Sequence, residues 1–397
     1  MKRKILFVID SLNSGGAEKS LISLLSLLDY DKYEVDLLRF KDGGLYEPLL
    51  NENIKLIERP CVFEVMDKSL KDLINDRKYS DLIWRVKSSI NIRIKLKLGN
   101  ISHGAQLMWP NLNYRINTLK KEYDVAIAYS QGTPTYFVSE KVKAKKKLSW
   151  VNIDYKFAKY NKSFDERYYK NFNNIVAVSE ACANVLIDVF PEYKDRIKVI
   201  YDIISENIIK DMGKSAKGFN DTYNGIRILT IGRLVYQKGY EFAIQAARIL
   251  KENGVDFRWY AIGEGDLKDE LEELIKKYKL EDEFILLGTF VNPYPFLREC
   301  DIYCQPSRFE GFGLAIAEAR IFNKPIVATN FDIVHDQLKH EQNGVIAEMN
   351  GESVANSLME VLINNELRGK IIDNLSKEEI DTENELKKIC KLMEEGL

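Results

Sequence analysis

The residues typical of disulfide-bonded, zinc-binding and membrane-spanning proteins are scarce in this sequence. Its 397 residues include five cysteines, at positions 61, 182, 300, 304 and 390, and none of them has the paired spacing of a zinc or redox site. We therefore expect a reduced compartment. No run approaches the roughly 18 apolar residues of a membrane span. The five apolar residues Ile5–Ile9 after the basic start are too few for a signal peptide. These absences predict a globular, cytoplasmic protein.

An excess of one charge is also missing, since 58 basic residues face 60 acidic ones. This balance excludes a polycation built to coat nucleic acid. The chain is nevertheless asymmetric, because its first 200 residues are net positive and the remainder is net negative. Between Asp81 and Glu122 there is no acidic residue, and basic side chains alternate there with large apolar ones such as Trp84 and Ile90. The basic residues of this stretch are Arg85, Lys87, Arg93, Lys95, Lys97, Arg115, Lys120 and Lys121.

Such a stretch, together with a second lysine run over 141–147, has three interpretations. Basic residues beside Trp and Ile are typical of a surface that lies on anionic lipid headgroups. An ordinary helix with a charged face and a nucleic-acid patch are the alternatives. We favour contact of residues 82–121 with an anionic membrane surface, which makes the protein peripheral on the cytoplasmic face, and we expect no nucleic-acid partner.

Short apolar runs rich in β-branched residues alternate with segments of helical periodicity along the whole chain, which predicts parallel sheets with helices on both faces. A polar, Gly/Lys/Asn-rich segment at 201–225 interrupts the alternation and is the best candidate for a linker. We predict an N-terminal Rossmann-like domain (residues 1–205), a C-terminal one (206–380), and a final helical segment (381–397). The expected strands are Lys4–Asp10, Tyr33–Phe40, Ile54–Ile57, Val125–Tyr129, Lys147–Asn152, Asn174–Ser179, Lys198–Ile200, Ile226–Gly232, Phe257–Gly263, Phe284–Leu287, Asp301–Gln305, Pro325–Thr329 and Gly344–Ala347.

Two loops that follow expected strands carry residues suited to phosphate. Gly15 and Gly16 stand directly before a helix start, where the backbone can approach a phosphate near free N–H groups. They lack the G-x-G-x-x-G spacing, and an ordinary βα turn is the alternative. Arg233 and Lys238 flank the turn after the first strand of the second block. Two cations at that place can neutralise a diphosphate, although a solvated loop with two ordinary bases fits as well.

The most specific segment runs from Ser307 to Ala319, in letters SRFEGFGLAIAEA. It follows an expected strand, and its glycines permit a tight approach before an Ala/Leu/Ile helix begins. If that helix starts near Gly313, Glu310 lies in the loop and Glu318 in the second helical turn, so that both carboxylates can reach one ligand. Carboxylates beside a helix N-terminus are suited to accept hydrogen bonds from sugar and ribose hydroxyls.

The combination of motifs resembles the retaining, nucleotide-sugar-dependent glycosyltransferases of family 4, which have the GT-B fold. The matching pieces span nearly the whole chain in the expected order, and the Glu–seven residues–Glu element is the family hallmark. The resemblance implies two Rossmann-like domains that face a cleft, with the C-terminal helix crossing back onto the first domain. The pieces are GGAEK, NNIVAVSE, IGRLVYQKG, AIGEGDLKDEL, LLGTFVN and FEGFGLAIAEA.

The resemblance also implies a role for each matching residue. Arg233 and Lys238 would hold the diphosphate, and Glu310 the donor sugar; these three form the expected catalytic set. The remaining residues would bind the donor: Gly15 and Gly16 at its phosphate, Gly311, Phe312, Gly313 and Leu314 at the sugar through their N–H groups, Glu318 at the ribose, and Phe290 and Val291 beside the base with Gly263 and Glu264 nearby.

One position departs from the family pattern. Many relatives carry a histidine in the segment that here reads Ser149–Asp154, and Asn152 occupies its place. The family histidine is thought to line the donor sugar, so its loss puts the preferred donor in doubt. His103 is expected to be an acceptor-side or surface residue. The segment Gln131–Tyr136 is a candidate for seating the acceptor.

We predict a hexosyltransferase-type glycosyltransferase that retains the anomeric configuration, needs no metal or cofactor, and transfers a sugar from a UDP-, GDP- or similar nucleotide sugar to a lipid-linked or polysaccharide hydroxyl. Cell-envelope polysaccharide biosynthesis is the expected setting. The main alternative is a non-catalytic GT-B subunit that binds glycan or a partner protein, which the departure at Asn152 motivates. An NAD-dependent dehydrogenase is disfavoured because the dinucleotide fingerprint is missing.

Overall fold

The computed structural model describes residues 2–13, 15–99, 103–380, 382 and 384–396. The chain divides into two compact units. Unit 1 comprises residues 1–13, 17–201 and 385–397, and unit 2 comprises 14–16 and 202–384. The sequence-based boundaries after 205 and 380 lie within four residues of these divisions.

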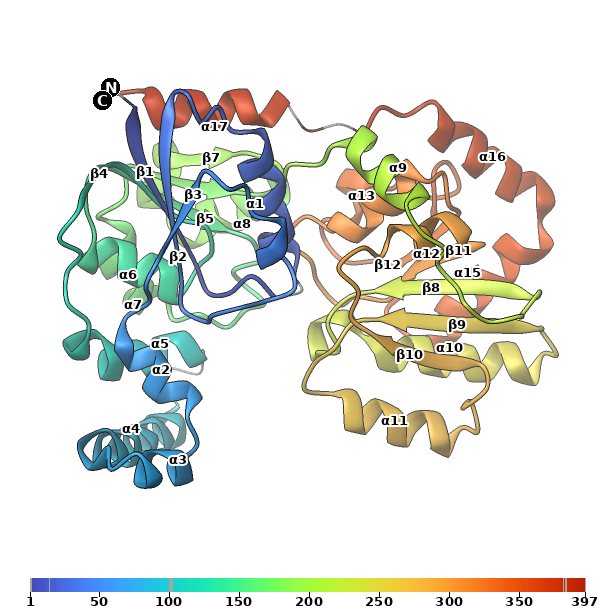
Figure 1. The fold of residues 1–397 in the computed structure, drawn as a ribbon. Helices are drawn as coiled ribbons and strands as arrows, with labels where there is room; N and C mark the ends of the chain where they lie inside the picture. Colours follow the sequence, from blue (N-terminus) through green and yellow to red (C-terminus); the bar gives the residue numbers. More distant parts are fainter. Residues whose placement is uncertain (1, 14, 100–102, 381, 383, 397) are drawn as a thin grey trace. The chain divides into compact units, whose positions relative to one another are not determined.

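Unit 1 is built on a seven-stranded parallel sheet with the strand order β3-β2-β1-β4-β5-β6-β7 (Figure 1). Every residue from Ile5 to Ile9 of the central strand β1 is buried, because helices cover both faces of the sheet. The register runs from Arg3 opposite Tyr33 to Ile9 opposite Arg39. The strands are β1 (Arg3–Ile9), β2 (Tyr33–Arg39), β3 (Ile54–Ile57), β4 (Glu122–Ala128), β5 (Lys143–Val151), β6 (Asn174–Ala177) and β7 (Ile197–Val199).

Four helices, α2 to α5, are inserted between β3 and β4, where a simple crossover needs only one. Figure 1 shows α3 and α4 side by side at the lower end of this insertion, away from the sheet. The helices of unit 1 are α1 (Gly16–Leu27), α2 (Cys61–Asp67), α3 (Leu70–Asn75), α4 (Tyr79–Leu98), α5 (Gly104–Leu112), α6 (Thr133–Lys141), α7 (Lys162–Tyr169), α8 (Glu180–Val189) and α17 (Asn384–Glu394), with 3-10 turns at Glu47–Leu49, Asn113–Arg115 and Pro191–Arg196.

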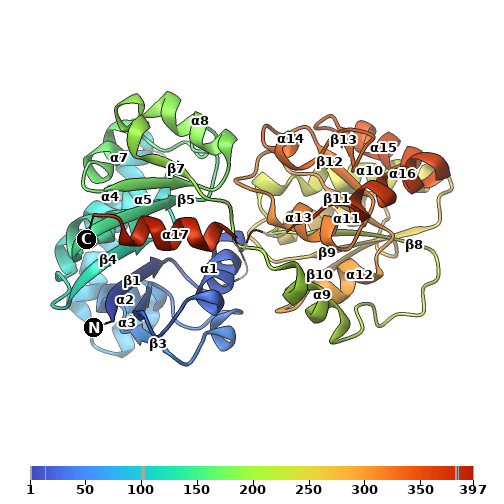
Figure 2. The same cartoon turned by 90° about the horizontal axis from the view of Figure 1, so that it is seen from above.

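The last helix, α17, packs on unit 1 although the preceding chain belongs to unit 2 (Figure 2). Its Ile389 and Met393 are fully buried. The Tyr33 hydroxyl donates a hydrogen bond to Glu394 at 2.7 Å, and Lys146 donates to the Glu395 carbonyl at 2.6 Å. The predicted return of the final helix to the first domain is confirmed.

Unit 2 repeats the architecture with a six-stranded parallel sheet in the order β10-β9-β8-β11-β12-β13. Its strands are β8 (Ile226–Ile231), β9 (Phe257–Ile262), β10 (Phe284–Gly288), β11 (Ile302–Gln305), β12 (Ile326–Thr329) and β13 (Val345–Ala347). Its helices are α9 (Glu206–Lys214), α10 (Tyr240–Glu252), α11 (Lys268–Lys277), α12 (Tyr294–Glu299), α13 (Leu314–Ile321), α14 (Val334–Gln337), α15 (Gly351–Ile363) and α16 (Asn365–Ser376), with a 3-10 turn at Tyr236–Lys238.

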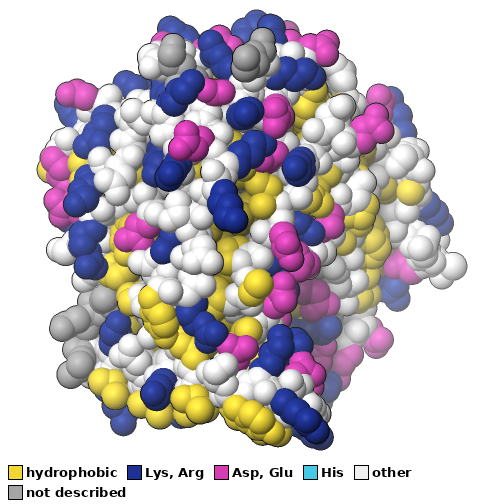
Figure 3. Space-filling view, turned by 60° about the vertical axis from the view of Figure 1, so that its left-hand side comes forward, with side chains coloured by type: hydrophobic (Ala, Val, Ile, Leu, Met, Phe, Trp, Pro, Cys, Tyr) yellow, Lys and Arg dark blue, Asp and Glu magenta, His cyan; other side chains and the backbone are white. Residues whose placement is uncertain are grey.

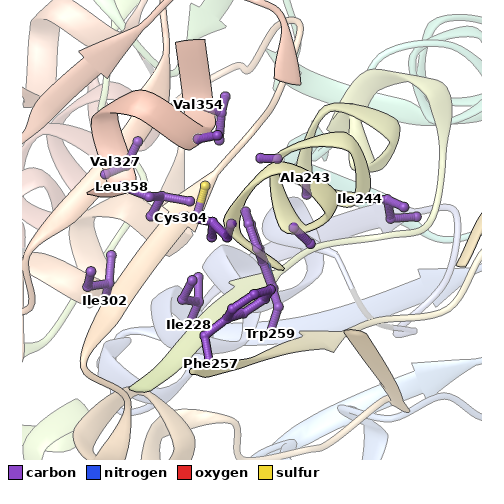
Figure 4. Packing of buried hydrophobic residues seen from close by; sticks show 14 of the residues in the cluster. Ile228, Ala243, Ile244, Phe257, Trp259, Ile302, Cys304, Val327, Val354 and Leu358 are labelled. Carbon is purple, nitrogen blue, oxygen red and sulfur yellow. The ribbon is translucent and has the colours of Figure 1, made fainter. Parts of the chain in front are cut away.

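The core of unit 2 lies between its sheet and the helices α10 and α15 (Figure 4). The ring of Trp259 on β9 stands beside Phe257, and Ala243 on α10 faces the apolar side chains of α15 such as Val354 and Leu358. Gly351, the first residue of α15, lets the two helices approach closely, since it lies against the side chain of Gln245 on α10 with no room for a Cβ. This rigid layer supports the loops that leave the carboxyl ends of the strands.

The predicted linker at 201–225 is wrong in one respect, because it contains helix α9 packed within unit 2. Ile209 of α9 is buried, and Gly213 lies so close to the Phe322 ring that a Cβ there would be 2.7 Å from it. A polar composition hid the helix, because only one narrow side of it is apolar. No helix among the described residues is long and apolar enough to cross a membrane. The fold is nevertheless the predicted pair of parallel α/β domains.

Candidate functional site

Unit 2 has a topological switch point between β8 and β11. From β8 the chain proceeds to β9 and β10 on one side, whereas β11 leads to β12 and β13 on the other. In open parallel sheets the loops at such a point diverge, and ligands bind in the crevice at the carboxyl ends of the strands. The two loops that flank this crevice are residues 232–239 after β8 and 306–313 after β11.

The two loops are joined by an ion pair. Lys238 Nζ lies 2.6 Å from Glu310 Oε1, and both side chains are largely buried. The Gln237 side chain donates to the Phe309 carbonyl at 2.9 Å, which fixes the same junction. Gly239 has φ of +60°, and a Cβ there would lie 2.1 Å from the Pro306 carbonyl oxygen, so only glycine lets the loops meet.

Glu310 is also held from its own side of the crevice. Ser307 Oγ donates to Glu310 Oε1 at 2.6 Å and Gln305 Nε2 donates at 3.0 Å. Three donors therefore converge on one carboxylate, which fixes its rotamer before any ligand arrives. The sequence interpretation did not assign roles to Ser307 and Gln305. A strand that ends in two polar residues just before the glycine loop is the signal that could have revealed them.

Arg233 differs from Lys238, although both were predicted to hold a diphosphate. Its side chain is exposed, and among the described residues it forms no ion pair. Leu234, the next residue, is fully buried and anchors the loop. A fixed lysine beside an unpaired arginine leaves positive charge available for an anion at this edge of the sheet.

The loop after β9 approaches the loop after β8 very closely. A Cβ on Gly263 would lie 1.9 Å from the Gly232 carbonyl oxygen, and one on Gly265 would lie 2.4 Å from that of Leu234. Backbone bonds lock the arrangement, with Leu234 N donating to Glu264 O at 3.0 Å. The structure thus places Gly263 and Glu264 beside the Arg233 loop, whereas their expected place near the base of a donor stays a prediction.

Helix α13 begins at Leu314, after Gly313 in the left-handed conformation with φ of +80°. Glu318 is therefore in its second turn and is 2% exposed. The Tyr294 hydroxyl donates to Glu318 Oε1 at 3.1 Å. Gln337 holds the preceding loop by donating to the carbonyls of Phe312 and Gly313. Glu318 and the 311–313 loop thus share one rigid support.

The residues predicted to flank a base lie after β10. The Phe290 ring packs on Phe296 with centroids 4.6 Å apart, so it is held in place. Val291 is 39% exposed. The structure brings the loops after β8, β9 and β11 together around Arg233, while Phe290 and Val291 follow the neighbouring edge strand β10.

Unit 1 has its own switch point, between β1 and β4. Gly15 and Gly16 follow β1, and Gly16 is the first residue of α1. Asp10 accepts a hydrogen bond from Ser130 Oγ at 3.0 Å across this point. Asn152, at the end of β5, donates from its Nδ2 to the Tyr129 carbonyl at 2.6 Å.

The amide of Asn152 is not fully used by these contacts. Its backbone N–H donates to Gln131 Oε1 at 3.0 Å, and its Oδ1 is buried without a hydrogen-bond partner. An unsatisfied buried acceptor costs free energy unless a donor reaches it. The position that carries histidine in the family pattern thus presents an open acceptor at the end of a strand.

The basic stretch of unit 1 is divided by the structure into inward and outward residues. Arg85 donates to the carbonyls of Val65 and Lys68, Arg115 pairs with Asp81, and Lys121 pairs with Glu34 and Asp36. Trp84 is only 8% exposed. Arg85, Arg115 and Lys121 are therefore engaged in contacts within unit 1, and the predicted contact of residues 82–121 with a membrane stays a prediction.

The second lysine run is likewise structural. Lys145 pairs with Asp124 at 2.7 Å, and Lys147 donates to the Ser139 carbonyl at 2.9 Å. Alternate residues of strand β5 point to opposite faces, so its lysines are used by neighbouring strands and helices. No group of three potential metal ligands occurs among the described residues.

Comparison with known proteins shows what this chain is similar to. Residues 215–378 match the family described as "Glycosyl transferases group 1". The N-acetylgalactosamine-N,N'-diacetylbacillosaminyl-diphospho-undecaprenol 4-alpha-N-acetylgalactosaminyltransferase of Campylobacter jejuni is 24% identical over 92% of both chains. The uncharacterized glycosyltransferase MJ1178 of Methanocaldococcus jannaschii is 30% identical in a match that covers 51% of this chain and 54% of MJ1178.

Several other curated relatives are likewise matched over only about half of their length or less. Solved structures match the whole chain. Anabaena HepE in complex with UDP and glucose has 18% identity and a TM-score of 0.70, covering 99% of this chain and 100% of HepE. Staphylococcus aureus TarM has 16% identity and a TM-score of 0.65, covering 99% and 100%. These structures share the fold of two parallel α/β domains, and the family match covers most of the second domain.

Proposed function

We propose that this chain, whose residues 215–378 match the group 1 glycosyl transferases, is a glycosyltransferase. It transfers a sugar from a nucleoside diphosphate sugar to a hydroxyl of a lipid-linked or polysaccharide acceptor, with retention of configuration. The observation that carries the proposal is the junction of the loops after β8 and β11. There the buried Lys238–Glu310 pair, 2.6 Å apart, lies at a topological switch point, and its lysine shares a loop with the exposed, unpaired Arg233.

The relatives support the substrate classes. HepE has been crystallised with UDP and with UDP-glucose, and the Campylobacter jejuni relative is named for a diphospho-undecaprenol acceptor. A Staphylococcus aureus relative, 31% identical over 38% of this chain, is a poly(ribitol-phosphate) alpha-N-acetylglucosaminyltransferase. HepE is thus described with a nucleotide sugar, and the two transferases are named for a lipid-linked and a polymeric acceptor.

In the proposed reaction, the bond between the sugar C1 and the diphosphate oxygen breaks while the acceptor oxygen bonds to C1 on the same face. The acceptor proton passes to the departing phosphate oxygen, so the products are a glycoside and a nucleoside diphosphate. Arg233 and Lys238 stabilise the charge that develops on the leaving group. Glu310 accepts hydrogen bonds from the donor sugar, and Glu318 from the ribose.

The remaining assignments complete the donor site. Gly15 and Gly16, together with the N–H groups of 311–314, contact the donor phosphate and sugar, and Phe290 and Val291 flank the base. We propose that no metal ion or cofactor is required, because two cations and the N-termini of helices supply the positive charge.

The proposed location is the cytoplasmic face of a membrane. The five cysteines are all free thiols, which agrees with a reduced compartment. A lipid-linked acceptor places the reacting hydroxyl near the membrane surface, and the basic stretch within residues 82–121 supplies the contact with anionic lipid.

The test is nucleotide release from a panel of UDP-, GDP- and ADP-sugars, with and without lipid-linked and polysaccharide acceptors. We expect release with one donor class, unchanged by a chelator, and an NMR spectrum of the product that shows the donor's anomeric configuration. Release that is abolished by the chelator contradicts metal independence. Donor binding or release with none of the panel would favour the alternative, a non-catalytic GT-B subunit, for which the replacement of a family histidine by Asn152 is the motivating observation.

A further inference from the structure

Helix α4 carries an apolar stripe on its outward face. Tyr79, Ile83, Val86, Ile90 and Ile94 are each at least 43% exposed, although they are large apolar side chains. Their spacings of four, three, four and four residues place them on one side of the helix. An aliphatic stripe of this length left open to solvent indicates a binding surface.

The opposite face of α4 is occupied within unit 1. Trp84 is buried and its Nε1 donates to the Asn111 carbonyl at 3.2 Å, while Asn91 donates to the Asn111 side chain at 2.8 Å. Arg115 lies over the Trp84 ring and pairs with Asp81. The exposed stripe is therefore not a core face that has lost its partner, since α4 already packs through its other side.

Helix α3 extends the stripe sideways. Leu70 and Ile74 are 46% and 49% exposed, whereas Leu73 between them is fully buried. The α3 and α4 helices contact each other. Figure 3 shows apolar and basic side chains gathered along the lower edge of the molecule, where Figure 1 places these two helices. We call the seven exposed apolar residues of α3 and α4 the apolar stripe.

Basic side chains border the apolar stripe. At about 100° per residue, Lys97 points in the same direction as Tyr79, and Lys87 and Arg93 lie on either side of the stripe. The three form no ion pair within the described part of the chain, in contrast to Arg85 and Arg115. After Asp81, helix α4 has no acidic residue at all.

We propose that the apolar stripe and Lys87, Arg93 and Lys97 form a docking surface for an anionic lipid bilayer, in which α4 lies in the plane of the interface. This inference rests on the proposed lipid-linked acceptor and names the surface that meets it. The outward face of α4 carries only basic charge, and an aliphatic helix face bordered by Lys and Arg is typical of helices that lie on anionic lipid. The acidic residues near the stripe belong to α3 and its end, where Asp72 caps the helix and Asp76 pairs with Lys68. Aliphatic side chains of such helices enter the headgroup region by about 5–10 Å.

The docking helix α4 is rigidly connected to the carboxyl end of the unit 1 sheet, where the switch point between β1 and β4 lies. Helix α5, on which α4 packs, is tied to α7 by Gln106, whose side chain donates to Asp165 at 2.6 Å. Trp109 on α5 donates to Glu140 on α6 at 3.2 Å. Ala105 at the start of α5 lies beside Gly132, the residue that precedes α6. Lipid contact at α4 therefore sets the distance between the membrane and the start of α6, at the carboxyl end of β4 in unit 1.

The experiment is flotation of the full chain with vesicles of phosphatidylcholine containing phosphatidylglycerol, and with pure phosphatidylcholine. We expect flotation with the anionic vesicles that weakens as salt rises. The double variant Arg93→Gln/Lys97→Gln should reduce the partition coefficient about 25-fold, at about fivefold per charge. The variant Ile83→Gln/Ile90→Gln should reduce it at least tenfold.

The matched controls lie on exposed helices of unit 2. Lys276→Gln/Lys277→Gln on α11 and Ile363→Gln/Ile372→Gln on α15 and α16 should float like the wild type. Circular dichroism should show unchanged folding for all four variants. Flotation of the α4 variants equal to that of the wild type overturns the proposal, and so does a wild-type chain that does not float.

Two further outcomes also overturn it. Self-association in sedimentation that the Ile83→Gln/Ile90→Gln change abolishes would identify the stripe as a face between two copies, and RNA binding lost with Arg93→Gln/Lys97→Gln would identify a nucleic-acid surface. Nucleotide release without vesicles, measured on the same variants, separates this inference from the proposed function. Flotation that depends on α4 in a chain without any donor activity would leave the docking surface intact and reject the enzyme.

Discussion

Asp165 in unit 1 and Glu310 in unit 2 are both buried carboxylates that accept hydrogen bonds from three side chains. The donors to Asp165 are Gln106, Tyr136 and Tyr155, each at 2.6 Å and all uncharged. Those to Glu310 include the lysine at 238. Asp165 lies on helix α7 among aromatic rings, whereas Glu310 stands in a loop at the carboxyl end of a parallel sheet.

The difference shows that burial and a full set of donors do not mark a functional site. Burial raises the pKa of Asp165, and its donors are spent on holding α5, α6 and α7 together. Glu310 instead occupies the topological switch point, with the unpaired Arg233 on the loop beside it. The position in the topology and the spare positive charge distinguish the candidate site from a structural hub.

The largest expected effect is on the rate of sugar transfer, and it distinguishes two basic residues of unit 2 from a paired lysine of unit 1. Arg233→Ala and Lys238→Ala should each lower the rate of sugar transfer by about 10²–10³-fold, because each removes a charge that stabilises the leaving diphosphate. Lys121→Ala is the control in unit 1, since Lys121 is also paired with a buried carboxylate, Asp36, and with the exposed Glu34. The measurement is nucleotide release with the donor identified by the panel.

Lys121→Ala should leave the rate per folded molecule unchanged. Near-normal turnover of Arg233→Ala, or an equal loss in Lys121→Ala, would show that the switch point of unit 2 is not the donor site. Arg233 is the sharper probe of the two, because its exposed side chain can be removed without opening a cavity.

The unit 2 site was predictable because its chemistry is local in sequence. A strand, a loop and a helix recur within a dozen residues around Lys238 and around Glu310, and the positive φ values of Gly239 and Gly313 explain why glycine occurs there. Parallel strands bring their carboxyl ends to one edge, so sequence alone placed both loops together. It did not reveal Gln305 and Ser307, whose role depends on a side-chain network.

The structural hub at Asp165 could not be predicted, since its donors come from residues about 60, 30 and 10 positions away in sequence. The outward face of the basic stretch could not be predicted for a related reason. Periodicity shows that α4 is amphipathic, but which side faces the protein is decided by Trp84 and its contact with Asn111 on another helix. The segment 201–225 was assigned as a linker because the packing of α9 on α12 leaves little trace in its composition.

The second prediction tests the hub by stability. Asp165→Ala should lower the free energy of unfolding by about 3 kcal/mol, because two phenols and an amide lose a buried acceptor. Asp188→Ala, on helix α8 of the same unit, is the control and should change it by less than about 0.5 kcal/mol. Urea unfolding followed by fluorescence measures both.

The rate of sugar transfer per folded molecule should survive Asp165→Ala. The converse comparison is Glu310→Gln, which keeps the size of the side chain and an acceptor oxygen and should lose turnover per folded molecule. If Asp165→Ala abolished transfer while the protein remained folded, the division of the two carboxylates into hub and site would be incorrect.

The smallest effect compares a histidine from each unit. His103 caps helix α5, since its Nδ1 accepts the Ala105 N–H at 3.3 Å, and its ring stacks on Tyr160 with centroids 3.6 Å apart. Burial lowers the pKa of His103 to about 4, from 6.5 in the unfolded chain. The unfolded state therefore binds more protons between these values, and the contribution of His103 to stability is complete above pH 6.5 and declines as the pH falls toward 4.

His103→Asn keeps a side-chain acceptor at the helix cap but removes the titration. Relative to this variant, the wild type should lose on the order of 1 kcal/mol of unfolding free energy between pH 7 and pH 5. His335→Asn in unit 2, measured in parallel, shows what replacing an exposed histidine does. If the difference in unfolding free energy between the wild type and His103→Asn stayed constant over this pH range, the His103 ring would accept a proton while it remains stacked on Tyr160. The insertion of unit 1 would then carry no pH dependence through this residue, and its link to the crevice would rest on Gln106 and Trp109 alone.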